Sequence, residues 1–198
     1  MKNLAIFSLF VVAAASQAQG TVTRVCGDGF AIPDGNPTGG SSSITLATAG
    51  TLSSITLTNL THTWVGDLIA TITGPSGTFT LFDNIGGGGP CNGDSSNFVG
   101  TYSFANGGNN IWTEAGNGTS AYNLVAGTYS TSNNVGTQLT MNTALAAGTY
   151  TLKIVDICTI DSGAVGGWCI DYTPVPEPAS MAVLGAGALA LIRRRRSK

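Results

Sequence analysis

A pair of alternating apolar runs around one tight turn constrains this chain more than any other feature. Residues 68–73 put every second side chain on one face of an extended strand: Leu68, Ala70 and Ile72. Residues 74–77 read Gly-Pro-Ser-Gly, and residues 78–82 resume the alternation. A period of two is typical of a half-buried strand, and proline with glycine favours a turn. The pattern predicts a β-hairpin over residues 68–82.

The same period recurs on both sides of this hairpin. Ile55 and Leu57 alternate with threonines, and residues 149–157 place Tyr150, Leu152 and Ile154 on one face. We expect residues 161–167 to turn the chain and residues 168–172 to return beside that strand. Before residue 179 no window keeps a helical period, so we predict an all-β, jelly-roll-like β-sandwich. The competing right-handed β-helix needs a fixed repeat, which the sequence lacks.

Composition divides the chain into four parts. Residues 1–18 have a basic Lys2, an apolar run and a Ser-Gln-Ala end, which predicts a signal peptide cut after Ala18 by signal peptidase. A buried N-terminal helix is the alternative. Residues 19–42 are rich in Gly, Pro and Asn, which predicts an irregular lead-in of loops with at most one edge strand. Residues 43–173 hold the sandwich, and residues 174–198 form a separate tail.

The charge of the exported part excludes one class of partner. The whole chain carries a net charge of −2, but only Arg24 and Lys153 of its basic residues lie between residues 19 and 173. Nine acidic residues lie in the same stretch, which gives that part a net charge of −7. Without a basic patch it cannot neutralise phosphates, so we predict no nucleic-acid binding. Cations are the expected small partners.

Four cysteines, all in the exported part, predict two disulfides: Cys26, Cys91, Cys158 and Cys169. Three connectivities are open. We favour Cys158–Cys169, because a hairpin is expected to join these two residues, and Cys26–Cys91 then follows. No CxxC spacing occurs and the chain has a single His, so zinc binding is not expected.

The tail combines three parts in a fixed order. The sequence Val-Pro-Glu-Pro at residues 175–178 precedes a 14-residue apolar run at 179–192 and a basic end at 193–198 with four arginines: Arg193, Arg194, Arg195 and Arg196. A helix of that length spans about 21 Å, short of the ~30 Å hydrocarbon core, and basic flanks stay cytoplasmic.

This order of parts closely resembles the PEP-CTERM sorting signal of Gram-negative bacteria that make exopolysaccharide. The resemblance implies that exosortase processes the chain near Pro176, Glu177 and Pro178, and that the tail occupies the inner membrane transiently. The mature protein would then reach the cell envelope, the cell surface or the extracellular matrix. The alternative is a tail anchor that is never cut.

The central segment resembles a second family. Residues 62–68 (His-Thr-Trp-Val-Gly-Asp-Leu), the turn at 74–77 and residues 80–83 are similar to the P domain (P/Homo B) of the proprotein convertases. Residues 148–156 resemble its closing strand, and Asp161, Gly163 and Trp168 match its final hairpin. The resemblance covers residues 43–173 and implies a jelly-roll sandwich. The family's acidic region is replaced here by Phe-Ala-Asn-Gly at residues 104–107, and no protease domain accompanies it in this chain.

Candidate chemistry is sparse. His62 and Asp67 are five residues apart in an extended segment, and no Gly-x-Ser-x-Gly elbow is present. We therefore expect these two side chains to bond to the backbone or to each other, with no catalytic residues and no enzymatic activity.

Four aspartates near loop ends are candidate calcium ligands: Asp83, Asp94, Asp156 and Asp161. Calcium is the only cofactor candidate, and ordinary turn capping is the alternative. Trp64 and Trp168 are expected in the core, whereas Trp112 lies in a Gly/Asn-rich loop and is the candidate ligand-binding aromatic.

We therefore expect a secreted, exosortase-processed, non-catalytic surface or matrix protein, associated with exopolysaccharide. The alternatives are a carbohydrate-binding module and an accessory domain for a protease acting in trans.

Overall fold

The computed structural model describes residues 20–87, 89, 91–115, 122–130, 143–175 and 187. The predicted processing residues Ala18, Pro176, Glu177 and Pro178 lie outside these described residues, and so do the apolar run of the tail, except for Gly187, and its arginines. The described residues therefore form the domain between the regions predicted to direct export and sorting.

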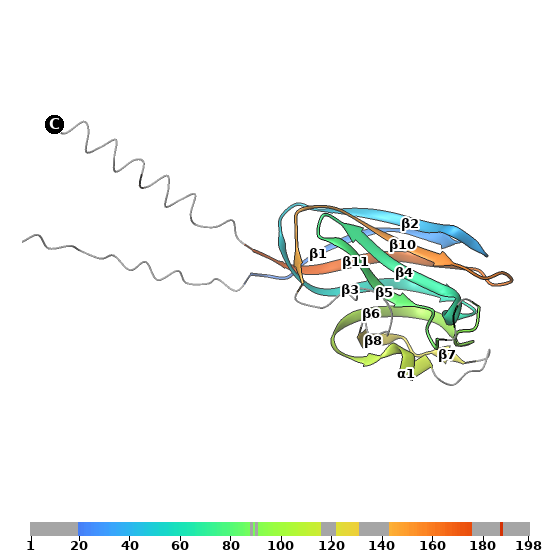
Figure 1. Cartoon of the computed structure of the whole chain (residues 1–198). Helices are drawn as coiled ribbons and strands as arrows, with labels where there is room; N and C mark the ends of the chain where they lie inside the picture. The colour runs from blue at the N-terminus through green and yellow to red at the C-terminus, as the bar shows by residue number, and fades with distance from the viewer. Residues whose placement is uncertain are drawn as a thin grey trace, which may run out of the picture.

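Two antiparallel-dominated sheets build the domain (Figure 1). The larger sheet has the order β1 (Thr23–Ile32), β11 (Gly163–Pro174), β3 (Gly50–His62), β6 (Asn97–Asn110) and β7 (Asn123–Leu124). Two short strands join it: β8 (Gly127–Ser130) beside β6 and β9 (Ala144–Leu145) beside β3. The smaller sheet has the order β2 (Asn36–Leu46), β10 (Gly148–Asp156), β4 (Leu68–Gly74) and β5 (Gly77–Asp83). The 3-10 turn η1 (Val65–Asp67) and the helix α1 (Ile111–Ala115) lie between strands.

Successive long strands cross between the two sheets. The chain passes from β1 in the larger sheet to β2 in the smaller, back to β3, across to β4 and β5, and back to β6. The last crossing joins β10 to β11. This arrangement confirms the predicted all-β, jelly-roll-like sandwich.

The predicted hairpin is confirmed as β4 and β5, in which Ile72 pairs with Phe79 and Gly74 with Gly77. Its inward side chains Leu68, Ala70 and Ile72 are at most 1% exposed, as the alternation predicts. They face a core that also holds the inward residues of β3 and β10. Phe82 packs against Phe98 and Phe104 of the other sheet, with ring centroids 5.4 and 5.9 Å apart.

The prediction for residues 19–42 is wrong, because β1 and most of β2 occupy this stretch. Several of its glycines are positions of close approach and do not mark loops. A Cβ at Gly29 would lie 2.3 Å from the carbonyl oxygen of Val165, and one at Gly40 would lie 2.1 Å from that of Ala31. Only glycine lets neighbouring backbones come this close. Composition alone therefore suggested turns where the structure has two long strands.

The expected hairpin between residues 149–157 and 168–172 is also wrong. The first segment lies in β10 of the smaller sheet, whereas the second lies in β11 of the larger sheet. Residues 157–162 carry the chain from one layer to the other. Both strands have the predicted alternation, but they face each other across the core and do not pair.

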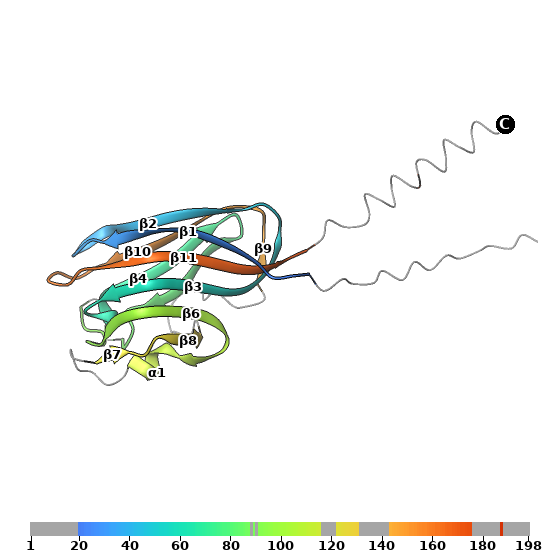
Figure 2. The ribbon, with the colours of Figure 1, turned by 180° about the vertical axis from the view of Figure 1, so that it is seen from behind.

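Both ends of the domain leave from the same end of the sandwich (Figures 1 and 2). Thr23 at the start of β1 pairs with Tyr172 near the end of β11. Backbone pairing reaches Val175, whose N–H donates to the carbonyl of Ala49 at 3.0 Å. The opposite end carries the end of β3, the start of β4, and the loop at residues 157–162. We call these the tail end and the distal end.

Candidate functional site

A pocket of about 500 Å³ opens at the distal end. Three segments far apart in the chain form it: residues 63–67 directly after β3, Cys91 in the loop after β5, and the crossing loop at residues 157–162. Its walls include the indole of Trp64 and the side chain of Ile160, and its polar groups include Asp67 and Asp161. A mixed apolar and polar lining of this volume is typical of a small-molecule site.

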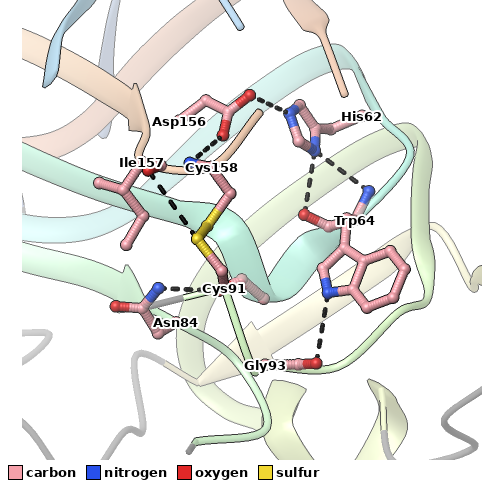
Figure 3. Close-up of a disulfide and its surroundings, with 9 residues drawn as sticks. His62, Trp64, Asn84, Cys91, Gly93, Asp156, Ile157 and Cys158 are labelled. Atoms are coloured by element: carbon pink, nitrogen blue, oxygen red, sulfur yellow. Dashed lines mark hydrogen bonds and ion pairs between the residues drawn. A yellow bond between two sulfur atoms is a disulfide. The ribbon is translucent and has the colours of Figure 1, made fainter. Parts of the chain in front are cut away.

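A buried contact between His62 and Asp156 supports the segment that lines the pocket (Figure 3). His62 Nε2 lies 3.2 Å from Asp156 Oδ2, and neither side chain is exposed. The other oxygen of Asp156 accepts the backbone N–H of Cys158 at 3.0 Å. Nδ1 of His62 lies 3.0 Å from the carbonyl oxygen and 3.2 Å from the nitrogen of Trp64. The pair therefore joins β3 to β10 and orients the segment that carries Trp64 and η1.

The two disulfides differ from the favoured pairing. Cys26 bonds to Cys169 and Cys91 to Cys158. Cys26 and Cys169 are direct partners in the β1–β11 ladder, so the register of these strands brings them together. Cys158 cannot reach Cys169 in the same way, because it lies in the crossing loop between the two sheets. That all four cysteines form disulfides is confirmed.

The Cys91–Cys158 disulfide lines the pocket (Figure 3). It ties Cys91, in the glycine-rich loop after β5, to the crossing loop. The Gly66 N–H joins the same loop to η1 by donating to Asp94 O at 3.0 Å. Asn84 donates through Nδ2 to the carbonyl of Gly66 at 2.7 Å. The covalent bond and the hydrogen bonds together hold the three pocket-forming segments in one arrangement.

Asp67 is the least satisfied polar group of the site. Only 4% of the residue is exposed, and its Oδ1 is buried without a hydrogen-bond partner among the described residues. Burial, followed by the charges of Asp156 and Asp161, raises the pKa of Asp67 to about 6, and His62 partly opposes this shift. A carboxylate in such surroundings destabilises the fold unless a cation reaches it.

At the rim of the pocket, Ile160 has a strained backbone conformation and an exposed side chain. Ile160 is 93% exposed and has a φ of 96°, a left-handed conformation that β-branched residues rarely adopt. The Thr63 hydroxyl donates to Oδ1 of Asp161. Nε1 of Trp64 donates to the carbonyl of Gly93 at 3.3 Å, which fixes the indole in the pocket wall. Trp64 was expected in the core, but it is half-buried here.

The four calcium candidates do not converge. Asp156 binds His62 and the Cys158 N–H, Asp94 accepts the Ser96 N–H at 2.8 Å, and Asp161 accepts the Thr63 hydroxyl. Asp83 lies at the end of β5, where burial raises the pKa of its carboxyl. In the part of the chain that the structure describes, no three His, Cys, Asp or Glu side chains form a metal-binding group. These aspartates mainly cap turns and fasten side chains.

Trp112 is not part of the pocket. It lies in α1, half-buried against the core, with its Nε1 buried and without a hydrogen-bond partner among the described residues. The edge of its ring lies close to Gly87, where an added Cβ would be 3.4 Å away. The structure therefore gives Trp112 a packing position, whereas Trp64 is the indole that faces a cavity.

The sequence predicted that His62 and Asp67 bond to the backbone or to each other, and the structure shows the first alternative for His62. His62 binds the backbone of Trp64, as expected, but its side-chain partner is Asp156, 94 residues away. Asp67 stands apart and lines the pocket. One signal of this was present, since Asp67 is flanked by apolar residues. No local pattern indicated that residues 91 and 158–161 would close around it.

Comparison with known proteins identifies the tail. Residues 174–196 match the PEP-CTERM protein-sorting motif. No curated protein matches the chain. Among the described residues, no helix has both the length and the apolar character that crossing a bilayer requires.

Two solved structures align with most of this chain, at low identity and low TM-score. One is the complex of the Aeromonas sobria serine protease with the chaperone ORF2, at 15% identity and a TM-score of 0.42. The other is the serine protease of Aeromonas sobria, at 14% identity and a TM-score of 0.40. The alignments cover 83% and 82% of this chain, and 29% of each of those chains.

The motif in the tail, which starts at the last residue of β11, determines the functional conclusion. It indicates export and sorting to the cell envelope or surface, with exosortase as the processing enzyme.

Proposed function

We propose that this is an exported surface or matrix protein, cut by exosortase near residues 176–178, whose sandwich has no catalytic role. The observation that carries the proposal is the PEP-CTERM match at residues 174–196, which follows the sandwich without a spacer. The sandwich is the part that remains after sorting.

The position of the tail supports cleavage at that point. The last strand pairs with β3 as far as Pro174, opposite Gly50, and the Val175 N–H still bonds to Ala49. A cut within residues 176–178 would thus fall just beyond the last backbone hydrogen bond to the sandwich. It would release the tail without removing any strand of the domain.

The state of the only histidine supports a non-catalytic role. His62 is buried, and both ring nitrogens lie within hydrogen-bonding distance of protein atoms, Asp156 on one side and Trp64 on the other. A general base must reach a substrate proton directly or through one water. The imidazole has no open nitrogen for this task, and its contacts join strands.

The finer assignment of the sandwich as P-domain-like is part of the same proposal. Its support is the way in which the segments that resemble the family meet: His62 of the first segment pairs with Asp156 of the closing strand. A jelly roll closed by these two strands is what the resemblance implies.

The test is the mass of the protein in the envelope of the host that produces it. We expect a mature form without residues 1–18 and without the segment that follows residues 176–178. A variant with Pro176, Glu177 and Pro178 all changed to Ala should keep the tail, whereas Thr173→Ala, in β11 just outside the matched motif, should be processed normally. A wild-type protein that retains Arg193–Arg196 in the envelope would contradict the proposal.

A further inference from the structure

The distal pocket contains a buried carboxyl group that hydrogen bonds within the described part of the chain do not fully satisfy. Asp67 lines the pocket and is 96% buried, yet its Oδ1 has no hydrogen-bond partner there. Asp161 lies in the same wall and adds a second carboxylate. The third nearby carboxylate, Asp156, is already bound to His62. A ligand that enters the pocket therefore meets two carboxylates that favour a cation.

The size and walls of the pocket favour a molecule over a bare metal ion. A volume of about 500 Å³ is within the range of small-molecule sites. A calcium ion needs six to eight oxygen ligands around one point, and the described carboxylates of the site do not gather in that way. A protonated amine has three N–H donors on one nitrogen, and Asp67 and Asp161 can accept two of them.

The rest of the lining indicates what carries the amine. The indole of Trp64 and the exposed Ile160 form an apolar wall, which suits the C–H face of a sugar ring. Thr63 and Thr159 line the pocket beside them and can bond to ring hydroxyls. A lysine side chain would satisfy the carboxylates but has no hydroxyl for the two threonines. The lining thus matches a ring that bears both an ammonium and hydroxyl groups.

We propose that the distal pocket binds a protonated amino sugar, with its ammonium at Asp67 and Asp161 and its ring against Trp64. The strained, exposed Ile160 at the rim is consistent with a segment held in shape for a ligand. This inference goes beyond the sorting function. It can be tested on the unprocessed chain, so it stands or falls separately from the cleavage by exosortase.

The experiment is a titration of the full chain, purified in detergent with both disulfides formed, at pH 7. D-glucosamine should bind saturably and shift the NMR signal of the Trp64 indole N–H, whereas N-acetyl-D-glucosamine, which has no charge, should not. Asp67→Asn, which keeps the shape of the side chain, should weaken binding by about ten-fold or more, and Asp161→Asn should weaken it less. The matched control is Asp28→Asn, which removes one exposed carboxylate of β1 outside the pocket and should leave the affinity unchanged.

Several results would overturn the proposal. Equal binding of the N-acetylated sugar would show that the charge is not recognised. Tighter binding of Nα-acetyl-lysine amide would make the ligand a peptide side chain, and competition by calcium chloride that depends on Asp67 would make it a metal ion. Unchanged glucosamine affinity in both pocket variants, with a native near-UV circular dichroism spectrum, would place the binding elsewhere.

Discussion

Replacing Asp67 by asparagine should stabilise the protein at neutral pH and have no effect in acid. The folded state raises the pKa of this carboxyl from 3.8 to about 6, mainly through burial and then through Asp156 and Asp161. An acid with a raised pKa binds more protons folded than unfolded, so the free energy of unfolding falls as pH rises from about 4 to about 6. Above that window the loss is complete, and below it the side chain is neutral in both states.

The magnitude follows from the shift. About two pKa units at ~1.4 kcal/mol each give an upper limit of about 3 kcal/mol, and water in the pocket screens part of this. We expect Asp67→Asn to gain about 1–2 kcal/mol at pH 7, or a Tm higher by about 2–8 °C for a domain of this size.

Thermal unfolding at half-unit steps from pH 4 to pH 8 is the assay. The two curves should meet near pH 4 and separate steadily up to pH 6, and Asp28→Asn should follow the wild type throughout. Three charged or titratable neighbours face Asp67: His62 from β3, Asp156 from β10 and Asp161 from the crossing loop. Parallel curves for wild type and Asp67→Asn over the whole range would refute the assignment of a destabilised carboxylate.

Further substitutions test three kinds of contact that stabilise the fold: the disulfides, the His62–Asp156 pair and the Arg24–Asp171 salt bridge. Replacing Cys91 and Cys158 by serine should cost about 2–4 kcal/mol in denaturant unfolding and abolish glucosamine binding, whereas loss of Cys26–Cys169 should cost a similar amount and leave binding intact. His62→Ala should cost about 3–5 kcal/mol, because it removes a buried ring and leaves Oδ2 of the buried Asp156 without its partner, and an equal loss in Asp156→Asn would show that the pair acts as a unit. Arg24→Ala should cost at most about 1 kcal/mol near pH 7, because its side chain is largely exposed. The hydrogen bond to Arg24 is the main cause that lowers the pKa of Asp171, so its stabilisation should disappear below about pH 4; a constant Arg24→Ala difference down to pH 2 would contradict this.

The alternation of apolar residues correctly predicted the positions of the strands that bury one face against the core. In β4 and β10 one face is fully buried and the other is partly exposed, so polarity and position coincide. The strands β1 and β2 violate this, since most of their residues are half-buried or exposed. Their glycines and serines allow neighbouring backbones to come close, and these small residues do not alternate between apolar and polar along the strand.

The sequence could not predict which sheet β10 and β11 each join, for a different reason. Strands β10 and β11 each have the pattern of a hairpin arm, and a short loop joins them, so local rules favour pairing them. In the sandwich the short loop instead crosses between sheets, and β11 pairs with β1 and β3. The disulfide prediction failed for this reason, because Cys169 follows β11 into the larger sheet and meets Cys26 there.

The pocket could not be predicted from the sequence for the same reason. Its walls come from residues 63–67, residue 91 and residues 158–161, which only the packing of β3 in one sheet against β10 in the other brings together. The sequence did reveal an aspartate among apolar residues and a lone histidine. Their roles depended on Asp156, whose position opposite His62 no local spacing indicates.

Each of the two disulfides stabilises one end of the domain. At the tail end, Cys26–Cys169 and the bidentate contact of Arg24 with Asp171, at 2.7 Å through each oxygen, fasten β1 to the strand that leads into the sorting motif. Any pull on the tail would therefore be shared between two strands before it reached the core. At the distal end, Cys91–Cys158 fixes the pocket, which the 13 residues of β3 separate from the tail by on the order of 40 Å. A protein held at a surface by its C-terminal end would thus present the pocket outward, away from its attachment, where a ligand of the envelope or its surroundings can reach it.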